Sequence, residues 1–273
     1  MSTREQLAAR IRGGDVVFAP LALDALTARI AAQAGFGAVY LSGGALGFAN
    51  AVSEALLTVT EVAHVARHIV QRADVPLVVD AGVGFGDAVH VARTVWEMEN
   101  AGVAAIELED QVAPKRVSHH RGIEHLVSTD EMVAKLRVAV ESRTDRDMLL
   151  IARTGAVRNE SFAAAVERGI AYRDAGADVV MLAPSSEQEW DAAADAIGST
   201  LAAIVSLDLF PEDVWRRRGF GLVIDPFTAQ VEAVRAVRAV YETFARVGST
   251  GTDRREVMQG YSELAGLAGL DPL

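Results

Sequence analysis

Two carboxylates and a guanidinium each stand directly after a short apolar run of the chain. The three residues are Asp80, Glu109 and Arg153, and the runs before them are rich in Val, Ile, Leu and Ala. Such runs are typical of buried parallel strands, whose carboxyl ends meet on one side of a sheet. Neighbouring carboxylates repel unless a cation or a shared proton relieves them, and Mg²⁺ commonly takes one or two protein carboxylates. The pattern predicts metal binding or catalysis at Asp80 and Glu109, while a helix cap or a lysine ion pair explains it equally well.

A small polar segment and the arginine offer hydrogen-bond donors for an anion. Ser42, Gly43 and Gly44 follow another apolar run, and glycines let a backbone approach a ligand closely. Their amides and the serine hydroxyl could hold a carboxylate or a phosphonate. Arg153 could grip a carboxylate through two parallel hydrogen bonds. An ordinary turn and an ion pair with a neighbouring acid remain alternatives on spacing alone.

The segment 111–127 is a loop much longer than its neighbours, and it is dense in cationic and titratable side chains. Long loops at the mouth of an enzyme site often close over the substrate. Closure would bring Lys115, Arg116 and His119 over a bound anion. A solvated surface loop accounts for the same composition.

The elements that position these residues form a regular series, in which eight short apolar runs alternate with amphipathic stretches along the whole chain. The predicted strands are residues 16–19, 38–41, 76–79, 104–108, 148–152, 178–182, 201–205 and 221–224. The predicted helices are residues 22–34, 60–72, 87–101, 129–142, 161–175, 186–197, 211–217 and 228–247. Gly35, Gly102 and Gly176 follow three of these helices, where a left-handed C-cap favours glycine.

This series predicts an α/β fold, a single (β/α)8 TIM-type barrel domain that spans residues 1–273. An open doubly wound sheet usually has fewer strands and a glycine-rich phosphate loop after the first one, and residues 20–23 cannot form that loop. Barrel active sites lie at the carboxyl ends of the strands, where Asp80, Glu109 and Arg153 fall. We therefore expect an enzyme site around these three residues.

Composition excludes several classes of protein. Of the 273 residues 51% are hydrophobic, and the mean hydropathy of +0.20 suits a compact α/β domain. The net charge of −11 argues against nucleic-acid binding, which needs clustered Lys and Arg. Cysteine is absent, which rules out disulfides, thiolate metal sites and thiol catalysis. Since there is no apolar leader and no run of about 20 apolar residues, we expect a cytoplasmic protein that does not enter membranes.

Several segments of the chain resemble the isocitrate lyase/phosphoenolpyruvate mutase superfamily, above all its methylisocitrate lyases and carboxyphosphonoenolpyruvate mutases. The segments are Tyr40-Leu41-Ser42-Gly43, Asp80-Ala81, Gly84-Phe85-Gly86, Glu109-Asp110-Gln111, Pro114-Lys115-Arg116, Leu126-Val127-Ser128-Thr129, Glu131-Met132-Val133-Ala134-Lys135 and Ile151-Ala152-Arg153-Thr154. They occur in the family's order, from about residue 20 to about residue 245. The resemblance therefore covers nearly the whole chain.

The resemblance implies a Mg²⁺-dependent enzyme that makes or breaks a C–C or P–C bond in a small 2-oxo or 2-hydroxy acid through an enolate. It implies that Asp80 binds Mg²⁺ directly and that Glu109 holds the metal through water. The residues implied for catalysis are Arg153, Glu109, Lys115 and His119. The residues implied for substrate binding are Tyr40, Ser42, Gly43, Gly44, Ser118 and Arg153. It also implies a homo-oligomer, a dimer or tetramer, with a C-terminal helical tail at residues 245–273 exchanged between subunits.

The chain departs from the family pattern near the expected site. Val117 and Ser118 replace a cysteine and a glycine of the loop. Polar residues of the family are also replaced at Gly82, Ser53, Gly155, Ala183 and Val205, although Glu54 lies next to one of these positions. Valine can neither give nor take a proton, so thiol-dependent cleavage of isocitrate or methylisocitrate is not expected in its usual form. The loss of acidic partners also predicts weak binding of Mg²⁺.

Three functions are consistent with the sequence. The first is a diverged lyase that cleaves a C–C bond of a 2-hydroxy or 2-oxo acid, whose carboxylate Arg153 and the Ser42 segment would hold. The second is a decarboxylase or hydrolase of an oxaloacetate-like acid, which in this family needs no cysteine. The third is a non-catalytic carboxylate-binding protein, suggested by the lost acids. The retained Asp80, Glu109 and Arg153 favour the first.

Overall fold

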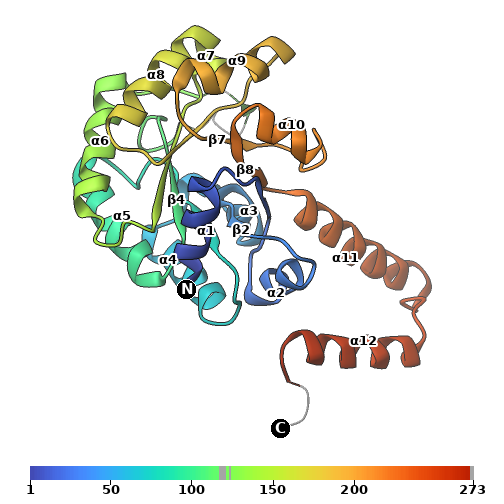
Figure 1. The fold of residues 1–273 in the computed structure, drawn as a ribbon. Coiled ribbons are helices and arrows are strands. Elements are labelled where there is room, and N and C mark those ends of the chain that lie inside the picture. Colours follow the sequence, from blue (N-terminus) through green and yellow to red (C-terminus); the bar gives the residue numbers. More distant parts are fainter. Residues whose placement is uncertain (117–120, 123, 271–273) are drawn as a thin grey trace.

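Eight parallel strands form a barrel at the centre of the fold (Figure 1). The computed structural model describes residues 1–116, 121–122 and 124–270. The strands are β1 (Val17–Pro20), β2 (Val39–Leu41), β3 (Leu77–Asp80), β4 (Ala105–Glu109), β5 (Leu149–Arg153), β6 (Val179–Met181), β7 (Leu201–Ile204) and β8 (Phe220–Asp225). Their order is β1-β8-β7-β6-β5-β4-β3-β2, and a parallel bridge between Leu21 and Tyr40 joins the two ends. The predicted (β/α)8 barrel is confirmed, and every predicted strand overlaps an observed one.

Helices follow the strands, and most of them cover the outside of the barrel (Figure 1). The predicted helical segments correspond to α2 (Ala25–Gln33), α4 (Val59–Val70), α5 (Ala88–Ala101), α6 (Thr129–Ser142), α8 (Phe162–Asp174), α9 (Glu187–Ile197), α10 (Glu212–Arg217) and α11 (Thr228–Val247). The expected tail contains α12 (Arg254–Leu267). Four elements were not predicted: α1 (Thr3–Arg12), α3 (Gly43–Ala49), the 3-10 helix η1 (Glu54–Leu56) and α7 (Ala156–Asn159).

Capping side chains explain two of the differences between prediction and structure. The Asp24 carboxylate accepts a hydrogen bond from Thr27 N at 2.8 Å, so α2 begins at Ala25 rather than at residue 22. Ser2 and Glu5 form a reciprocal capping box that starts α1 in a segment we interpreted only as polar. The buried residues of α1 pack with the inward-facing residues of the strands. This helix therefore closes the barrel at the end opposite the strand carboxyl ends.

The strands alternate between two packing environments. Val78 and Ala105 belong to the core inside the barrel, whereas Val79 and Ile106 pack in the layer shared with the helices. Successive side chains of a strand point to opposite faces, so this division follows from the strand period of two. The same period directs the last inward position of each strand into the mouth of the barrel.

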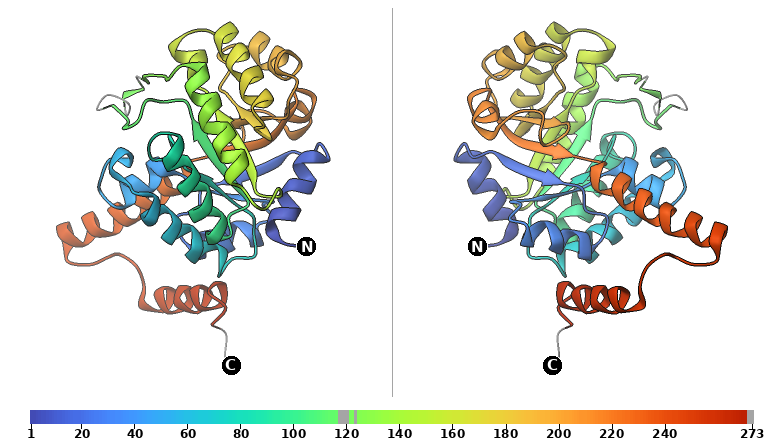
Figure 2. Two further views of the ribbon diagram at one scale, coloured as in Figure 1. Left: turned by 90° about the vertical axis from the view of Figure 1, so that its left-hand side faces the viewer. Right: turned by 90° about the vertical axis from the view of Figure 1, so that its right-hand side faces the viewer.

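The two C-terminal helices, α11 and α12, extend away from the barrel (Figure 2). None of the residues of α11 is buried. The end of α12 contacts α2, where Arg29 Nη1 donates to Leu267 O at 3.1 Å. Among the described residues, no helix combines the length and the apolar character that crossing a membrane requires.

Trp215 tests how far the aromatic packing beside β8 supports the barrel. Its ring is fully buried, with centroids 5.5 Å from those of Trp190 and of Phe220. We expect Trp215→Ala to lower the free energy of unfolding by about 3–5 kcal/mol, because it leaves a large cavity. The exposed Trp96 is the matched control, and Trp96→Ala should change the value by no more than about 0.5 kcal/mol. Urea unfolding measures both, and equal losses would contradict this assignment.

Candidate active site

Five polar side chains share the inside of the barrel at the carboxyl ends of four adjacent strands. They are Tyr40 on β2, Asp80 on β3, Glu107 and Glu109 on β4, and Arg153 on β5. Tyr40 and Glu107 are completely buried, and Asp80 and Glu109 are 8% and 2% exposed. Because the interior screens charge poorly, these groups interact strongly with one another.

Asp80 is held by backbone amides. Gly43 N donates to Oδ2 at 3.0 Å, and Gly82 N donates to Oδ1 at 2.9 Å. A Cβ atom at position 43 would lie 3.0 Å from Oδ2, so glycine permits this approach. Burial and the charge of Glu107 raise the pKa of Asp80 to about 7, although Lys115 opposes them. The residue predicted to bind metal is therefore rigidly oriented and short of positive partners.

The segment predicted as a polar turn is the beginning of α3. The Ser42 hydroxyl accepts a hydrogen bond from Ala45 N at 3.2 Å and caps the helix. Gly43 is engaged by Asp80, while Ser42 and Gly44 line the main cavity of the site. The contact of Ser42, Gly43 and Gly44 with a substrate carboxylate remains a prediction. Ser42 and Gly44 face the cavity in which such a substrate would bind.

Glu107 connects Tyr40 to Arg153. The Tyr40 hydroxyl donates to Oε2 at 2.7 Å, and Arg153 Nη1 donates to Oε1 at 2.9 Å. Burial disfavours the guanidinium charge, but Glu107 and Glu109 outweigh it and raise the pKa of Arg153. The sequence analysis missed Glu107, although its place two residues before Glu109 was a signal that both face inward. Arg153 is ion-paired with Glu107 and also lines the cavity. The ion pair and the predicted binding of an anion are therefore compatible.

Lys115 lies among the carboxylates rather than free above an anion. Its Nζ is 2.6 Å from Glu109 Oε1 and 2.5 Å from Glu54 Oε1. Gln111 Nε2 donates to the other oxygen of Glu109 at 3.0 Å. Burial opposes the ammonium charge, but Glu109 and Asp80 raise the pKa of Lys115 well above its usual range. The cation that we expected to face a bound anion is therefore neutralised by the acids of the site.

The arrangement as a whole carries an excess of negative charge. Its acids are Glu54, Asp80, Glu107 and Glu109, and its cations are Lys115 and Arg153. Glu109 Oε1 is ion-paired with Lys115 Nζ at 2.6 Å and accepts no hydrogen bond from any other described residue. A buried acceptor beside uncompensated carboxylates fits a hydrated divalent cation. No three His, Cys, Asp or Glu side chains of the described residues form a complete metal cage, and Mg²⁺ does not need one.

A cavity of about 1150 Å³ adjoins these groups. Its walls include Asp80, Glu109 and Arg153, together with Glu124 and Arg158 from the segments after β4 and β5. A second cavity of about 580 Å³ meets the first at Asp80. The polar groups at the strand ends are therefore accessible to a small molecule.

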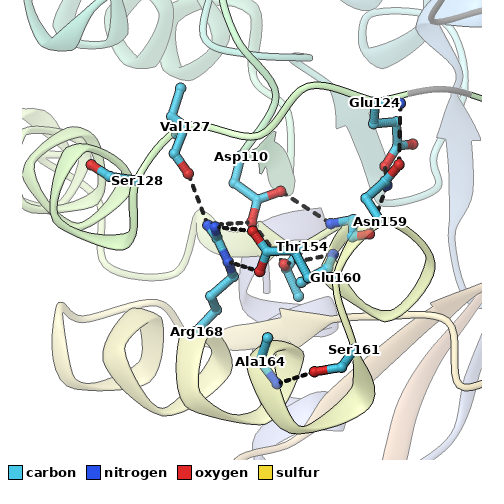
Figure 3. A network of polar contacts seen from close by, with 12 residues as sticks. Asp110, Glu124, Val127, Ser128, Thr154, Asn159, Glu160, Ser161, Ala164 and Arg168 are labelled. Atoms are coloured by element: carbon cyan, nitrogen blue, oxygen red, sulfur yellow. Dashed lines mark hydrogen bonds and ion pairs between the residues drawn. The ribbon is translucent and has the colours of Figure 1, made fainter.

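Asp110, which follows Glu109, belongs to a separate polar network (Figure 3). Its donors are Thr154 Oγ1 at 2.7 Å, Gly155 N at 3.0 Å, Tyr172 Oη at 2.9 Å and Arg168 Nη1 at 3.3 Å. Arg168 Nη1 also donates to Val127 O at 3.0 Å. The network ties the end of the 111–127 segment to the chain after β5, so it positions the walls of the site.

The remaining predicted residues fall into two groups. Val117, Ser118 and His119 lie outside the described residues, so their roles stay predictions. Ser185 and Asp225 follow β6 and β8 and form local hydrogen bonds: the Ser185 hydroxyl donates to the Glu189 carboxylate, and Asp225 accepts from Thr228 N.

The fold and the site define a class of protein, a TIM-barrel enzyme whose polar groups lie at the carboxyl ends of its strands. Within this class, the chain belongs to the phosphoenolpyruvate phosphomutase family, whose model matches residues 7–245. The family resemblance predicted from the sequence is confirmed.

Individual relatives support the same assignment. The chain is 36% identical to 2,3-dimethylmalate lyase of Eubacterium barkeri over 284 aligned positions, which cover 100% of this chain and 96% of that one. It is 37% identical to the probable 2-methylisocitrate lyase 2 of Corynebacterium glutamicum, with 96% and 86% covered. The crystal structure of a 2,3-dimethylmalate lyase superposes with a TM-score of 0.87 at 30% identity, covering 99% and 96%. That of phosphonopyruvate hydrolase with oxalate and Mg²⁺ has a TM-score of 0.85 at 30% identity, covering 98% and 99%.

Glu107→Ala tests whether this residue balances the buried arginine. The change removes the partner of Arg153 and of Tyr40, so we expect the free energy of unfolding to fall by about 3–5 kcal/mol. The exposed Glu212–Arg216 pair provides the control, and Glu212→Ala should cost less than about 1 kcal/mol. Urea unfolding measures the free energy of unfolding of both variants. Similar losses would show that Glu107 stabilises the protein no more than an exposed ion pair does.

Proposed function

We propose that the protein is a Mg²⁺-dependent lyase that cleaves a C–C bond in a small 2-hydroxy or 2-oxo carboxylic acid through an enolate. The observation that carries this proposal is the buried, negatively charged cluster beside Arg153 in one cavity. Similarity to 2,3-dimethylmalate lyase and to 2-methylisocitrate lyases supports the reaction class.

The acidic residues of the site would bind the metal, and Arg153 would bind the substrate carboxylate. Asp80 would hold Mg²⁺ directly, and Glu109 would hold it through water. When bound, the ion would polarise the substrate oxygens and stabilise the negative charge of an enolate. Arg153 is kept charged by Glu107 and has donors left for the substrate carboxylate. Lys115 bridges Glu54 and Glu109 and balances part of their charge.

Hydrolysis of an oxaloacetate-like acid is the second candidate function. The structure of oxaloacetate acetylhydrolase with 3,3-difluorooxalacetate superposes with a TM-score of 0.88 at 28% identity. The chain also has no cysteine, so a reaction that needs no thiol fits its composition. Products separate the candidates, because a lyase releases an oxo acid and hydrolysis releases oxalate.

Activity with defined acids tests the proposal. Incubation with Mg²⁺ and 2,3-dimethylmalate, 2-methylisocitrate or oxaloacetate is expected to consume at least one of them. Asp80→Asn should lower kcat/KM by about 100-fold or more, because a direct metal ligand is lost. Asp195→Asn on the surface of α9 is the matched control and should leave the rate unchanged. If none of the acids reacts while a relative from the same family succeeds in the same assay, the proposal is wrong.

We further propose that the protein is a homo-oligomer in which α11 packs on a neighbouring subunit. Val231, Val234, Val237 and Phe244 lie on one side of this helix and are 44–55% exposed. A cavity of about 490 Å³ separates the helix from its own barrel. The cavity is lined on the barrel side by Leu21, Leu23 and Thr27 and on the helix side by Ala233, Val237 and Tyr241. An apolar face left so open favours a partner copy of the chain.

Charge placed on this face tests the assembly. Val237→Asp should shift the protein toward monomer, because a carboxylate would be buried in the contact. Ala239→Asp adds the same charge about 200° further around the helix and should leave the assembly intact. Light scattering after gel filtration measures both masses. A monomeric unaltered protein, or equal dissociation by the two variants, would contradict the proposal.

A further inference from the structure

The Glu124 carboxylate occupies the space beside Gly155 that a side chain would otherwise fill. A Cβ atom built at Gly155 would lie 1.9 Å from Glu124 Oε2 and 3.2 Å from Asn159 Nδ2. The backbone of Gly155 has a φ of −85°, which any residue adopts. A side chain at position 155 would therefore have to displace the Glu124 carboxylate, which is the flexible end of its side chain, whereas the backbone conformation itself does not call for glycine.

Asn159 holds Glu124 at two points (Figure 3). Its Nδ2 donates to Glu124 Oε2 at 2.8 Å, and its Oδ1 accepts from Glu124 N at 3.3 Å. The same Nδ2 donates to Gly155 O at 2.8 Å. Side chain and backbone of Glu124 are therefore both fixed against α7, and the carboxylate has a defined place.

That place is in the wall of the main cavity, together with Arg153. The charged groups around Glu124 are Arg153 on β5, Glu109 and Asp110 at the end of β4, Arg158 on α7 and Arg121 in the preceding loop. Burial raises the pKa of Glu124, Glu109 and Asp110 act in the same direction, and Arg153 opposes them. The structure therefore places a carboxyl group with a raised pKa in the cavity wall near Arg153.

We propose that Glu124 is the proton donor of the active site, acting on the enolate formed from the substrate. The chain has no cysteine that could do so, and position 155 carries no acid. Glu124, supplied by the segment before α6, brings a proton-donating carboxyl to the same part of the cavity. This inference rests on the proposed lyase function and adds the residue that completes its reaction.

The step balances without a further reactant. The hydroxyl proton of the substrate leaves to water as the C–C bond breaks, and the bonding pair remains on the carboxylic acid fragment as an enolate. Protonated Glu124 gives its proton to the enolate carbon, and an oxo acid and a carboxylic acid result. The Glu124 carboxylate then recovers a proton from solvent.

Proton uptake on binding tests the place of Glu124 without any turnover. Oxalate is the probe, since as a dianion it resembles an enolate and would raise the proton affinity of a carboxylate facing it. Oxalate is titrated into protein already saturated with Mg²⁺, so that a proton released from Asp80 on metal binding is not counted. Calorimetry in buffers of different ionisation enthalpy, between about pH 5 and pH 8, then measures the protons taken up. The unaltered protein should take up protons in this range. Glu124→Gln should bind oxalate without that uptake, and Glu141→Gln on the surface of α6 should match the unaltered protein.

Two variants test the catalytic step on whichever acid the enzyme cleaves. Glu124→Gln should lower kcat by about 100-fold or more and remove the fall in kcat toward high pH, with KM little changed. Gly155→Ala pushes the carboxylate aside and should lower kcat similarly. The double variant with Glu124→Gln and Gly155→Ala should have nearly the same kcat as either single variant, because both changes remove the same carboxyl group from its place.

The outcomes separate this inference from the function on which it rests. If the unaltered protein neither binds oxalate nor cleaves any acid, both are wrong. If it binds oxalate and Glu124→Gln takes up the same number of protons, or keeps full kcat, Glu124 is not the donor while the lyase function stands. A Gly155→Ala variant with unchanged kcat would also overturn the assignment, because its Cβ excludes the observed position of Glu124.

Discussion

The rest of the site depends on one constraint, the burial of several carboxylates at the mouth of the barrel. Asp80, Glu107 and Glu109 are at most 8% exposed, and charge in such an interior is costly unless it is paired. The strand period of two and the parallel register bring these residues together, since Asp80 lies level with Glu107 and Glu109 lies level with Arg153. Lys115 and Arg153 balance only part of the charge. The remaining excess is what a bound divalent cation would satisfy.

The second layer of the structure keeps this arrangement in place. Glu107 accepts a hydrogen bond from Arg153 inside the barrel, and Asp110 accepts one from Gly155 N in the chain after β5. Arg168 connects Asp110 to the carbonyl of Val127, so the end of the 111–127 segment and the chain after β5 share one network (Figure 3). A charged network that is fully hydrogen-bonded in this way gives rigidity, which a site that stabilises an enolate requires.

Sequence reasoning predicted the barrel because each strand is a short apolar run, eight such runs alternate with helical segments, and the carboxyl ends of parallel strands must meet. It reached Asp80, Glu109 and Arg153 for the same reason. Glu107 was missed because it lies inside the apolar run of β4, and the strand period that places it on the same face as Glu109 was not applied to it. The pairing of Lys115 with Glu54, and of Glu124 with the space at Gly155, joins segments far apart in the chain. Spacing along one segment carries no information about such contacts.

A crystal structure of the protein with Mg²⁺ and oxalate tests the central claim most directly, since it shows the ion, the anion and the carboxylates together. The account predicts Mg²⁺ with Asp80 as a direct ligand, Glu109 joined to it through water, and oxalate within hydrogen-bonding distance of Arg153. Oxalate bound away from the strand ends would contradict the account. A structure obtained at saturating Mg²⁺ that shows no ion at Asp80, with Lys115 still paired with Glu109, would also contradict it.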